Sequence, residues 1–208
     1  MATLTLRLGI FGGTFDPPHI GHLILASEAL DQLELDRILW VLTPFPPHKT
    51  EIEITPLDIR LQMINASIEG NPNFLLSEVD IRRPPPHYAI DTIELIRKEN
   101  PGAELIYLMG SDSLMDLPFW HNPVLFVEEV DYIGVMCRPG VAINLSEIEQ
   151  EIPGLPAKVQ FFCGPEIGIS SSDIRRRIIE NRPYRYFVPE AVYRVILENH
   201  IYDERINM

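Results

Sequence analysis

The segment FGGTFDPPHIGH, residues 11–22, gathers residue types that can bind phosphate. Gly12 and Gly13 follow an apolar run, and glycine permits a tight or left-handed backbone that another group can approach closely. His19 and His22 lie at the expected start of a helix, where main-chain N–H groups and a partial positive charge favour anions. The pattern predicts a phosphate site in which two imidazoles stabilise charge on a reacting phosphate.

Two common phosphate motifs do not describe this segment. A P-loop ends in Gly-Lys-Ser/Thr, and a dinucleotide fingerprint has the spacing G-x-G-x-x-G, and the segment contains neither. Each feature alone has a plainer interpretation, since a glycine pair is often only a turn and a histidine near a helix start is often a surface or capping residue. Their combination in this order is what favours a functional site.

A second segment of the same chemistry, GISSSDIRRRI, occupies residues 168–178. Ser170 or Ser171 could cap a helix, with Asp173 in the position of a capping-box acid. The alternative is a phosphate site built from serine hydroxyls and amides with Arg175 one turn along. Arg176 and Arg177 point elsewhere on a helix, so we expect them to be solvated.

These segments resemble two motifs of one family. GGTFDPPHIGH resembles the T/H-x-G-H signature of the nucleotidyltransferase superfamily, and its longer form is similar to nicotinate-nucleotide adenylyltransferases. Residues 168–178 are similar to the I-S-S-S/T-x-I-R motif of that superfamily. The resemblance implies His19, His22 and Arg175 as catalytic residues. It also implies an ATP site formed by Gly12, Gly13, Thr14, Phe15, His22, Gly110, Asp112, Ile169, Ser170, Ser171, Ser172 and Arg175.

Three intervening segments resemble the acceptor side of nicotinate-nucleotide adenylyltransferases. They are the P-P-H-K loop at residues 46–49, the loop at 82–94, and a G-x-D-S-L stretch followed by a tryptophan at 108–123. The second departs from the family pattern at Pro85, His87 and Ala89, which leaves the choice between nicotinate and nicotinamide open. The resemblance implies a nicotinate mononucleotide site formed by Thr14, Lys49, Tyr88, Ala89, Trp120 and His121. Without it, Lys49 could be a solvated lysine and Trp120 a core residue.

The expected reaction is adenylyl transfer from ATP to nicotinate mononucleotide, giving deamido-NAD and pyrophosphate. A phosphate monoester has a second pKa near 6, so the acceptor needs no general base at neutral pH. Catalysis would rest on positioning and charge stabilisation. ATP would bring Mg²⁺, and the sequence predicts no metal site of the protein's own.

Alternative functions remain at this point. The acceptor could be nicotinamide mononucleotide or pantetheine phosphate, although pantetheine-phosphate adenylyltransferases are typically shorter and would not be expected to combine the P-P-H-K and tryptophan loops. Class I aminoacyl-tRNA synthetases share the H-I-G-H core but are usually much larger and carry a K-M-S-K-S loop. A non-catalytic nucleotide sensor could retain the same fold.

The elements that must position these residues alternate between strand and helix. Six apolar runs, 5–11, 37–43, 73–79, 104–110, 131–137 and 159–163, predict buried parallel strands. Segments 19–33, 56–70, 88–102, 171–182 and 189–200 predict helices. The order predicts an α/β fold: a doubly wound, Rossmann-like parallel sheet of the nucleotidyltransferase type, with ligands at the carboxyl ends of strands. We expect one domain, 1–208, with a small C-terminal helical region from about 170 that carries the second motif.

Composition limits the partners. The 208 residues carry a formal net charge of -13, which argues against nucleic acid as a partner. No apolar run is long enough to span a bilayer, and no signal-peptide pattern is present at residues 1–13, so we expect a cytoplasmic protein without a membrane partner. Cys137 and Cys163 lack metal-type spacing and are expected to be reduced. The oligomeric state stays open, a homo-oligomer included.

Overall fold

The predicted parallel sheet is present in the computed structural model, which describes residues 5–46, 54–137, 143–165 and 167–202. In this part of the chain six strands pair in parallel in the order β3-β2-β1-β4-β5-β6. The strands are β1 (Arg7–Gly13), β2 (Arg37–Leu42), β3 (Phe74–Ser77), β4 (Glu104–Gly110), β5 (Tyr132–Cys137) and β6 (Val159–Cys163). The doubly wound α/β fold is confirmed.

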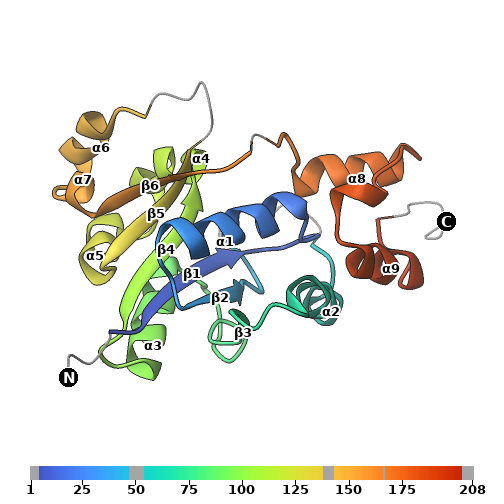
Figure 1. Ribbon diagram of the computed structural model, residues 1–208, viewed down its shortest axis with the longest axis horizontal. Coiled ribbons are helices and arrows are strands. Elements are labelled where there is room, and N and C mark those ends of the chain that lie inside the picture. Colours follow the sequence, from blue (N-terminus) through green and yellow to red (C-terminus); the bar gives the residue numbers. More distant parts are fainter. Residues whose placement is uncertain (1–4, 47–53, 138–142, 166, 203–208) are drawn as a thin grey trace.

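Helices cover both faces of this sheet and extend beyond one end of it (Figure 1). The five predicted helices are α1 (Ile20–Gln32), α2 (Leu57–Ile68), α3 (Ala89–Glu99), α8 (Ser171–Ile179) and α9 (Glu190–Glu198). Shorter ones, which the apolar pattern did not reveal, are α4 (Ser111–Met115), η1 (Leu117–Phe119), α5 (Pro123–Glu129), α6 (Leu145–Glu151), α7 (Leu155–Lys158) and η2 (Arg185–Phe187).

The sheet is buried on both sides, as continuous apolar strands require. Successive residues of a strand point to opposite faces, so β1 sends Leu8 and Ile10 into the cluster beneath α3 and α5 and Phe11 into the cluster beneath α1. Trp40 of β2 is fully buried in the second cluster. Each square ångström of apolar surface buried contributes about 25 cal/mol, so burial of both faces stabilises the sheet.

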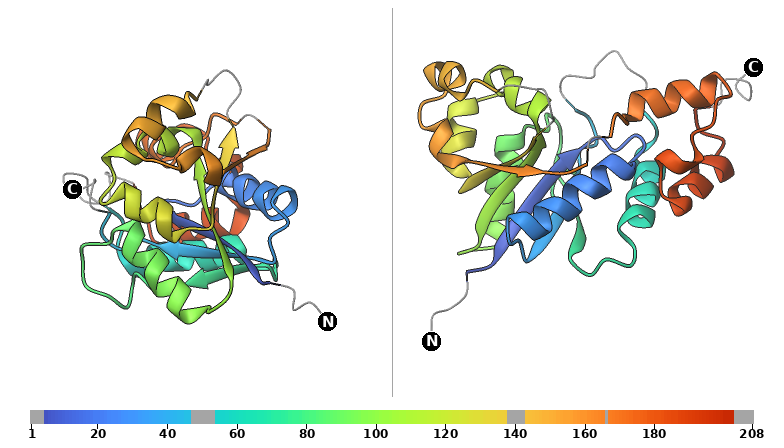
Figure 2. Two further views of the ribbon diagram at one scale, coloured as in Figure 1. Left: turned by 90° about the vertical axis from the view of Figure 1, so that its left-hand side faces the viewer. Right: turned by 45° about the horizontal axis from the view of Figure 1, so that its top comes forward.

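The C-terminal helices form a separate apolar cluster at one end of the molecule. Ile174 of α8 and Val192 and Ile196 of α9 are buried together with Met63 of α2. Figures 1 and 2 show α8 and α9 beyond the end of the sheet, next to α2 and to the N-terminus of α1. This packing brings the second predicted phosphate segment to the first one.

The strand order reverses between β1 and β4, which lie side by side at the centre of the sheet. Ligands of open α/β sheets bind outside the carboxyl ends of the strands at such a switch point. β1 ends at Gly13, and β4 ends at Gly110. Segments 11–22 and 108–123, which both carry predicted ATP-binding residues, therefore lie at the expected position.

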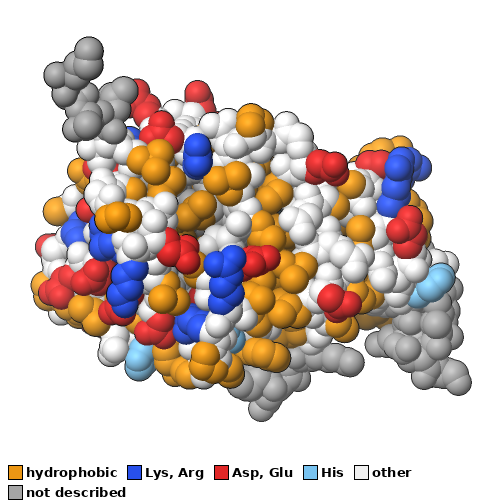
Figure 3. Space-filling view, turned by 90° about the horizontal axis from the view of Figure 1, so that it is seen from below, with side chains coloured by type: hydrophobic (Ala, Val, Ile, Leu, Met, Phe, Trp, Pro, Cys, Tyr) orange, Lys and Arg blue, Asp and Glu red, His pale blue; other side chains and the backbone are white. Residues whose placement is uncertain are grey.

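The surface mixes charge and apolar patches. Figure 3 shows acidic and basic side chains interspersed with hydrophobic ones over the face seen from below. Within the described residues, no helix has the length and apolarity needed to cross a membrane.

Candidate active site

The two histidines of the first segment lie against each other at the start of α1. His19 is the N-cap residue, and its ring stacks on the His22 ring with centroids 3.6 Å apart. The main-chain N–H of His19 donates to His22 Nδ1 over 3.1 Å. The His22 ring also packs at 70° to the Phe15 ring, 5.1 Å away. Both imidazoles are thereby held in fixed orientations at a helix N-terminus.

His19 is buried without a hydrogen-bond partner for one ring nitrogen. Its exposed fraction is 7%, and Nδ1 makes no hydrogen bond within the described structure. Burial lowers the pKa of His19 to about 4, because the charged form loses its hydration. The free protein therefore holds a neutral His19 at neutral pH. An anion beside the ring would favour the protonated form and raise this pKa.

Gly12 and Gly13 lie close to two aromatic side chains of the protein. Neither adopts a left-handed conformation; both lie in the last two positions of β1. A Cβ atom on Gly12 would lie 2.9 Å from the hydroxyl of Tyr107, and one on Gly13 would lie 2.9 Å from the Phe15 ring. The close approach is thus made by the protein's own aromatic side chains, and Phe15 itself has a φ of 48°.

The two predicted phosphate segments are in direct contact. Arg175 Nη1 donates to the main-chain carbonyl of Asp16 over 2.6 Å. Ser171 Oγ donates to the carbonyl of Pro17 over 2.9 Å. The segments that the sequence separates by about 150 residues therefore form one surface beside the histidine pair.

The start of α8 has the capping geometry predicted for it. Ser170 Oγ accepts from the main-chain N–H of Asp173 over 3.1 Å, and Arg175 Nη2 donates to Ser172 Oγ over 3.3 Å. Ile169, just before the cap, is half-buried and packs against the C-terminal cluster. At this helix N-terminus the Ser171 hydroxyl faces the β1–α1 loop, where it donates to the Pro17 carbonyl.

The two neighbouring arginines differ from each other. Arg176 is exposed and pairs with Asp173, as expected for a solvated side chain. Arg177 does not fit the prediction, because its guanidinium stacks 4.4 Å above the Phe187 ring and its side chain is only 22% exposed. Hydrogen bonds from Arg177 and then Arg176 lower the pKa of Asp173.

A buried polar cluster behind the β1–α1 loop was not predicted. Arg60 of α2 is 2% exposed, and its guanidinium donates to four main-chain carbonyls at 2.8 to 3.1 Å. These carbonyls belong to the loops after β1 and β2 and to the start of α2: Thr14, Thr43, Pro44 and Thr55. An arginine in a helical pattern gives no sequence signal for such a role, because most arginines are exposed.

Asp16 completes this cluster. Its carboxylate accepts from Tyr202 Oη over 2.5 Å and from the main-chain N–H of Thr55 over 3.3 Å. Burial first, and then the neighbouring Asp16 carboxylate, raises the pKa of Tyr202. Asp16 is only 5% exposed, so its carboxylate positions the loop from behind while its carbonyl accepts from Arg175.

The predicted ribose segment follows β4. Gly110 is the N-cap of α4, and Asp112 lies exposed in its first turn. Ser111 is fully buried, and its Oγ donates to the carbonyl of Met136 on β5 over 2.9 Å. This bond fixes the turn that presents Asp112.

Aromatic side chains gather on the predicted acceptor side. Trp120 is half-buried edge-on to Tyr107, with ring centroids 5.9 Å apart. Tyr88 and His121 stack with centroids 3.9 Å apart, which links the start of α3 to the tryptophan loop. Because Tyr107 also reaches Gly12, these rings connect to the β1–α1 loop. Ala89 opens α3.

Arg83 shapes the 82–94 loop. Its guanidinium pairs with the carboxylates of Asp80 and Asp91 at 3.0 and 3.2 Å. It also donates to the carbonyls of Pro86 and Tyr88. The loop that precedes α3 is therefore held in one conformation. Lys49, the predicted phosphate contact of the acceptor, lies outside the described residues.

A known family matches most of the chain. The Cytidylyltransferase-like family model matches residues 10–177. A protein of Thermomicrobium roseum named "Probable nicotinate-nucleotide adenylyltransferase" is 46% identical over 94% of this chain and 91% of its own length. The "Nicotinate-nucleotide adenylyltransferase" of Bacillus subtilis is 36% identical over 95% of this chain and 98% of its own.

A solved structure shares the fold. It is the nicotinic acid mononucleotide adenylyltransferase of Plasmodium falciparum complexed with NaAD, with a TM-score of 0.78 and 18% identity, covering 95% of this chain and 97% of its own. The fold and the site thus define a nucleotidyltransferase of the cytidylyltransferase-like class. Within that class, the chain belongs to the nicotinate-nucleotide adenylyltransferase family.

Proposed function

We propose that this protein transfers the adenylyl group of ATP to nicotinate mononucleotide, releasing pyrophosphate and forming deamido-NAD. The observation that carries the proposal is the contact between the two phosphate segments, in which Arg175 and Ser171 bind the carbonyls of Asp16 and Pro17 beside the stacked histidines. Relatives that carry this name at 46% and 36% identity over nearly the whole chain support the same reaction.

The chemistry asks for alignment and charge stabilisation. The 5′-phosphate of the acceptor attacks the α-phosphorus of ATP, a new P–O bond forms, and the bond to pyrophosphate breaks. The acceptor phosphate is already ionised at neutral pH, so no residue needs to remove a proton. His19 and His22 donate hydrogen bonds to the reacting phosphates, and Arg175 with the serines of α8 binds the leaving pyrophosphate.

The neutral state of His19 suits this role. A buried ring that carries no charge does not bind anions indiscriminately, yet it can donate one N–H to a phosphate oxygen. As negative charge increases near the ring, protonation becomes more favourable and the hydrogen bond strengthens. The orphaned Nδ1 is the atom of His19 for which the described structure supplies no other partner.

Mg²⁺ enters the proposal as part of the ATP complex. Among the described residues, no group of three or more His, Cys, Asp or Glu side chains could hold an ion. Asp16 already accepts two hydrogen bonds in a buried position. Triphosphate oxygens and water would hold the ion, where it would neutralise phosphate charge.

The acceptor would bind on the aromatic side of the switch point. Trp120 offers a ring for stacking on the pyridine, and the N–H groups at Tyr88 and Ala89, held by Arg83 and the start of α3, would bind the nicotinate carboxylate. Asp112 would bind a ribose hydroxyl. Thr14 and Lys49 would complete the site on the phosphate side.

We also propose that residues 1–208 act as one domain and work in the cytoplasm. The C-terminal helical portion supplies Ser171 and Arg175 to the loop after β1, so the site needs both parts. Free Cys137 and Cys163 favour a reducing compartment.

A pyrophosphate-release assay tests the function. ATP with nicotinate mononucleotide should give turnover, and equal concentrations of nicotinamide mononucleotide and phosphopantetheine should give much less. If either of those acceptors is preferred, nicotinate mononucleotide is not the substrate. If ATP binds but no pyrophosphate is released with any of the three acceptors, the protein is a nucleotide sensor and not an enzyme.

A further inference from the structure

The ends of β5 and β6 carry a pair of cysteines that the reaction does not use. Cys137 and Cys163 are direct partners in the parallel register of the two strands, and both are free thiols. Register partners in a parallel sheet point to the same face, and neighbouring strands lie about 4.8 Å apart. That spacing falls within the range of Cα separations that a disulfide spans.

The two cysteines differ in their exposure. Cys163 is exposed on strand β6, which pairs with β5 on one side, whereas Cys137 is half-buried. The pair thus combines one accessible thiol with one that is sheltered but adjacent.

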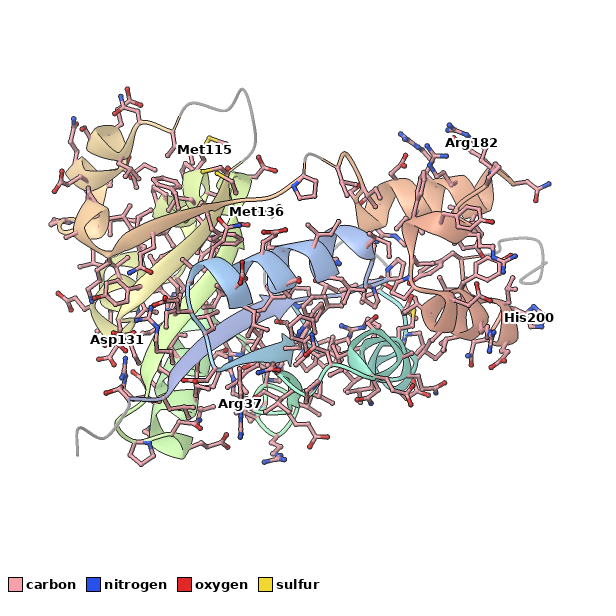
Figure 4. The ribbon with its side chains drawn as sticks, in the orientation of Figure 1. Arg37, Met115, Asp131, Met136, Arg182 and His200 are labelled. Atoms are coloured by element: carbon pink, nitrogen blue, oxygen red, sulfur yellow. The ribbon has the colours of Figure 1, made fainter. Side chains whose placement is uncertain are left out.

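The backbone at Cys163 is held in place from the other side. The Gln32 side chain of α1 donates to the carbonyl of Cys163 over 2.6 Å and accepts from its N–H over 3.1 Å. Met136, which precedes Cys137 and is labelled in Figure 4 near Met115, has its carbonyl bound by Ser111. Both cysteine backbones are therefore fixed at the spacing that the sheet sets.

We propose that Cys137 and Cys163 form a dithiol site for small-molecule disulfides, at which thiol–disulfide exchange closes a reversible cross-strand disulfide. The Cys163 thiolate attacks one sulfur of R–S–S–R and releases one R–S⁻, leaving a mixed disulfide on Cys163. The Cys137 thiolate then attacks the Cys163 sulfur and releases the second R–S⁻. The net change converts two protein thiols and R–S–S–R into one protein disulfide and two R–SH, and the thiol protons pass to the released thiolates through solvent.

The order of attack follows from exposure. Cys163 meets the small disulfide first because it is accessible. Burial, together with the neighbouring Cys163, raises the pKa of Cys137, so Cys137 is the poorer first nucleophile. Its proximity compensates in the second step, because a neighbouring group reacts at a high effective concentration.

The test uses the full chain with oxidised glutathione, followed by acid quenching, alkylation and intact-mass analysis. The wild type should lose two hydrogen atoms, gain no glutathione, and recover both thiols with dithiothreitol. The Cys137→Ser variant should stop at one glutathione on Cys163, at a level at least about tenfold above that of the wild type. Stable glutathione on the wild type at the level of the variant, or covalent dimers in place of the internal disulfide, would overturn the proposal.

A second measurement separates the folded geometry from mere sequence proximity. In urea the cysteines lie 26 residues apart on a flexible chain, so the closing step should slow by about tenfold or more and mixed disulfide should accumulate. An equal closing rate in folded and unfolded protein would show that the sheet does not build the site. The Cys163→Ser variant should react with glutathione more slowly than Cys137→Ser, since its remaining thiol is sheltered.

Discussion

Arg175 binds the main-chain carbonyl of Asp16 over 2.6 Å, although 159 positions separate the two residues in the chain. The bond joins the loop before α1 to the second turn of α8. Together with the bond from Ser171 to the Pro17 carbonyl, it brings the N-terminal ends of both helices, each with a partial positive charge, close to each other. Two helix N-termini that meet at one point make a stronger anion site than either alone. The relationship places Arg175 apart from its two neighbours, which bind Asp173.

Arg175→Ala should lower kcat/KM for ATP by about 100- to 1,000-fold, because it removes a cation from the phosphate surface. Arg176→Ala is the matched control on the same helix. Its side chain is 62% exposed, so its loss should change kcat/KM by no more than about threefold. Steady-state pyrophosphate release measures both, and equal losses would mean that net charge on α8, rather than Arg175, matters.

His19→Ala and His22→Ala should each lower kcat by about 100- to 1,000-fold while the fold persists, because each removes a donor to the developing charge. Single-turnover assays at saturating ATP isolate the chemical step, and circular dichroism monitors the fold. Near-wild-type turnover in either variant would remove that histidine from the mechanism.

The burial of His19 should also appear in the pH dependence of stability. An unfolded histidine has a pKa near 6.5, and burial lowers that of His19 to about 4. Between these values the unfolded state binds more protons, so stability rises with pH and is lost as pH falls. His19 should therefore destabilise the protein by about 2 kcal/mol near pH 5 relative to pH 7.5.

Urea unfolding at both pH values checks this effect. His19→Gln should remove most of the His19 contribution to the pH difference, whereas a variant of the exposed His121, His121→Gln, should keep it. If His19→Gln and the wild type show the same pH dependence, His19 is not buried in its neutral form.

Arg60→Met should lower the free energy of unfolding by about 3 to 5 kcal/mol, because it leaves buried carbonyls of two loops without donors. Arg82→Met provides the comparison, since the Arg82 side chain is 67% exposed and its loss should stay within about 0.5 kcal/mol. Equilibrium urea denaturation at neutral pH measures the difference. A small effect for Arg60 would mean that water replaces its hydrogen bonds.

The sequence could predict the sheet because the strand signals are local. The runs 104–110 and 159–163 match β4 and β6 residue for residue, since unbroken apolar segments between turn residues have few alternatives in a parallel sheet. The helices α4, α5, α6 and α7 were missed because they have seven residues or fewer, too short for a helical period to show.

The candidate site was predictable only in part. The motif residues could be proposed from type and spacing, but the residues that hold them could not. Arg60 binds distant backbone carbonyls, Tyr202 binds the Asp16 carboxylate, and Tyr107 packs close to Gly12. Nothing in the local sequence of these three residues indicates which loop they touch. The prediction for Arg177 failed for the same reason, because Phe187 approaches it from beyond the helix.

The hydrogen bond from Tyr202 to Asp16 has a consequence for the order in which the protein is made. The loop that carries His19 leaves the ribosome before its partners Arg175 and Tyr202, which follow 159 and 186 positions after Asp16. Synthesis proceeds at about 5–20 residues per second, so the sheet can begin to form many seconds before these partners exist. The nascent chain therefore carries an unfinished phosphate loop until Arg175 and Tyr202 have been synthesised.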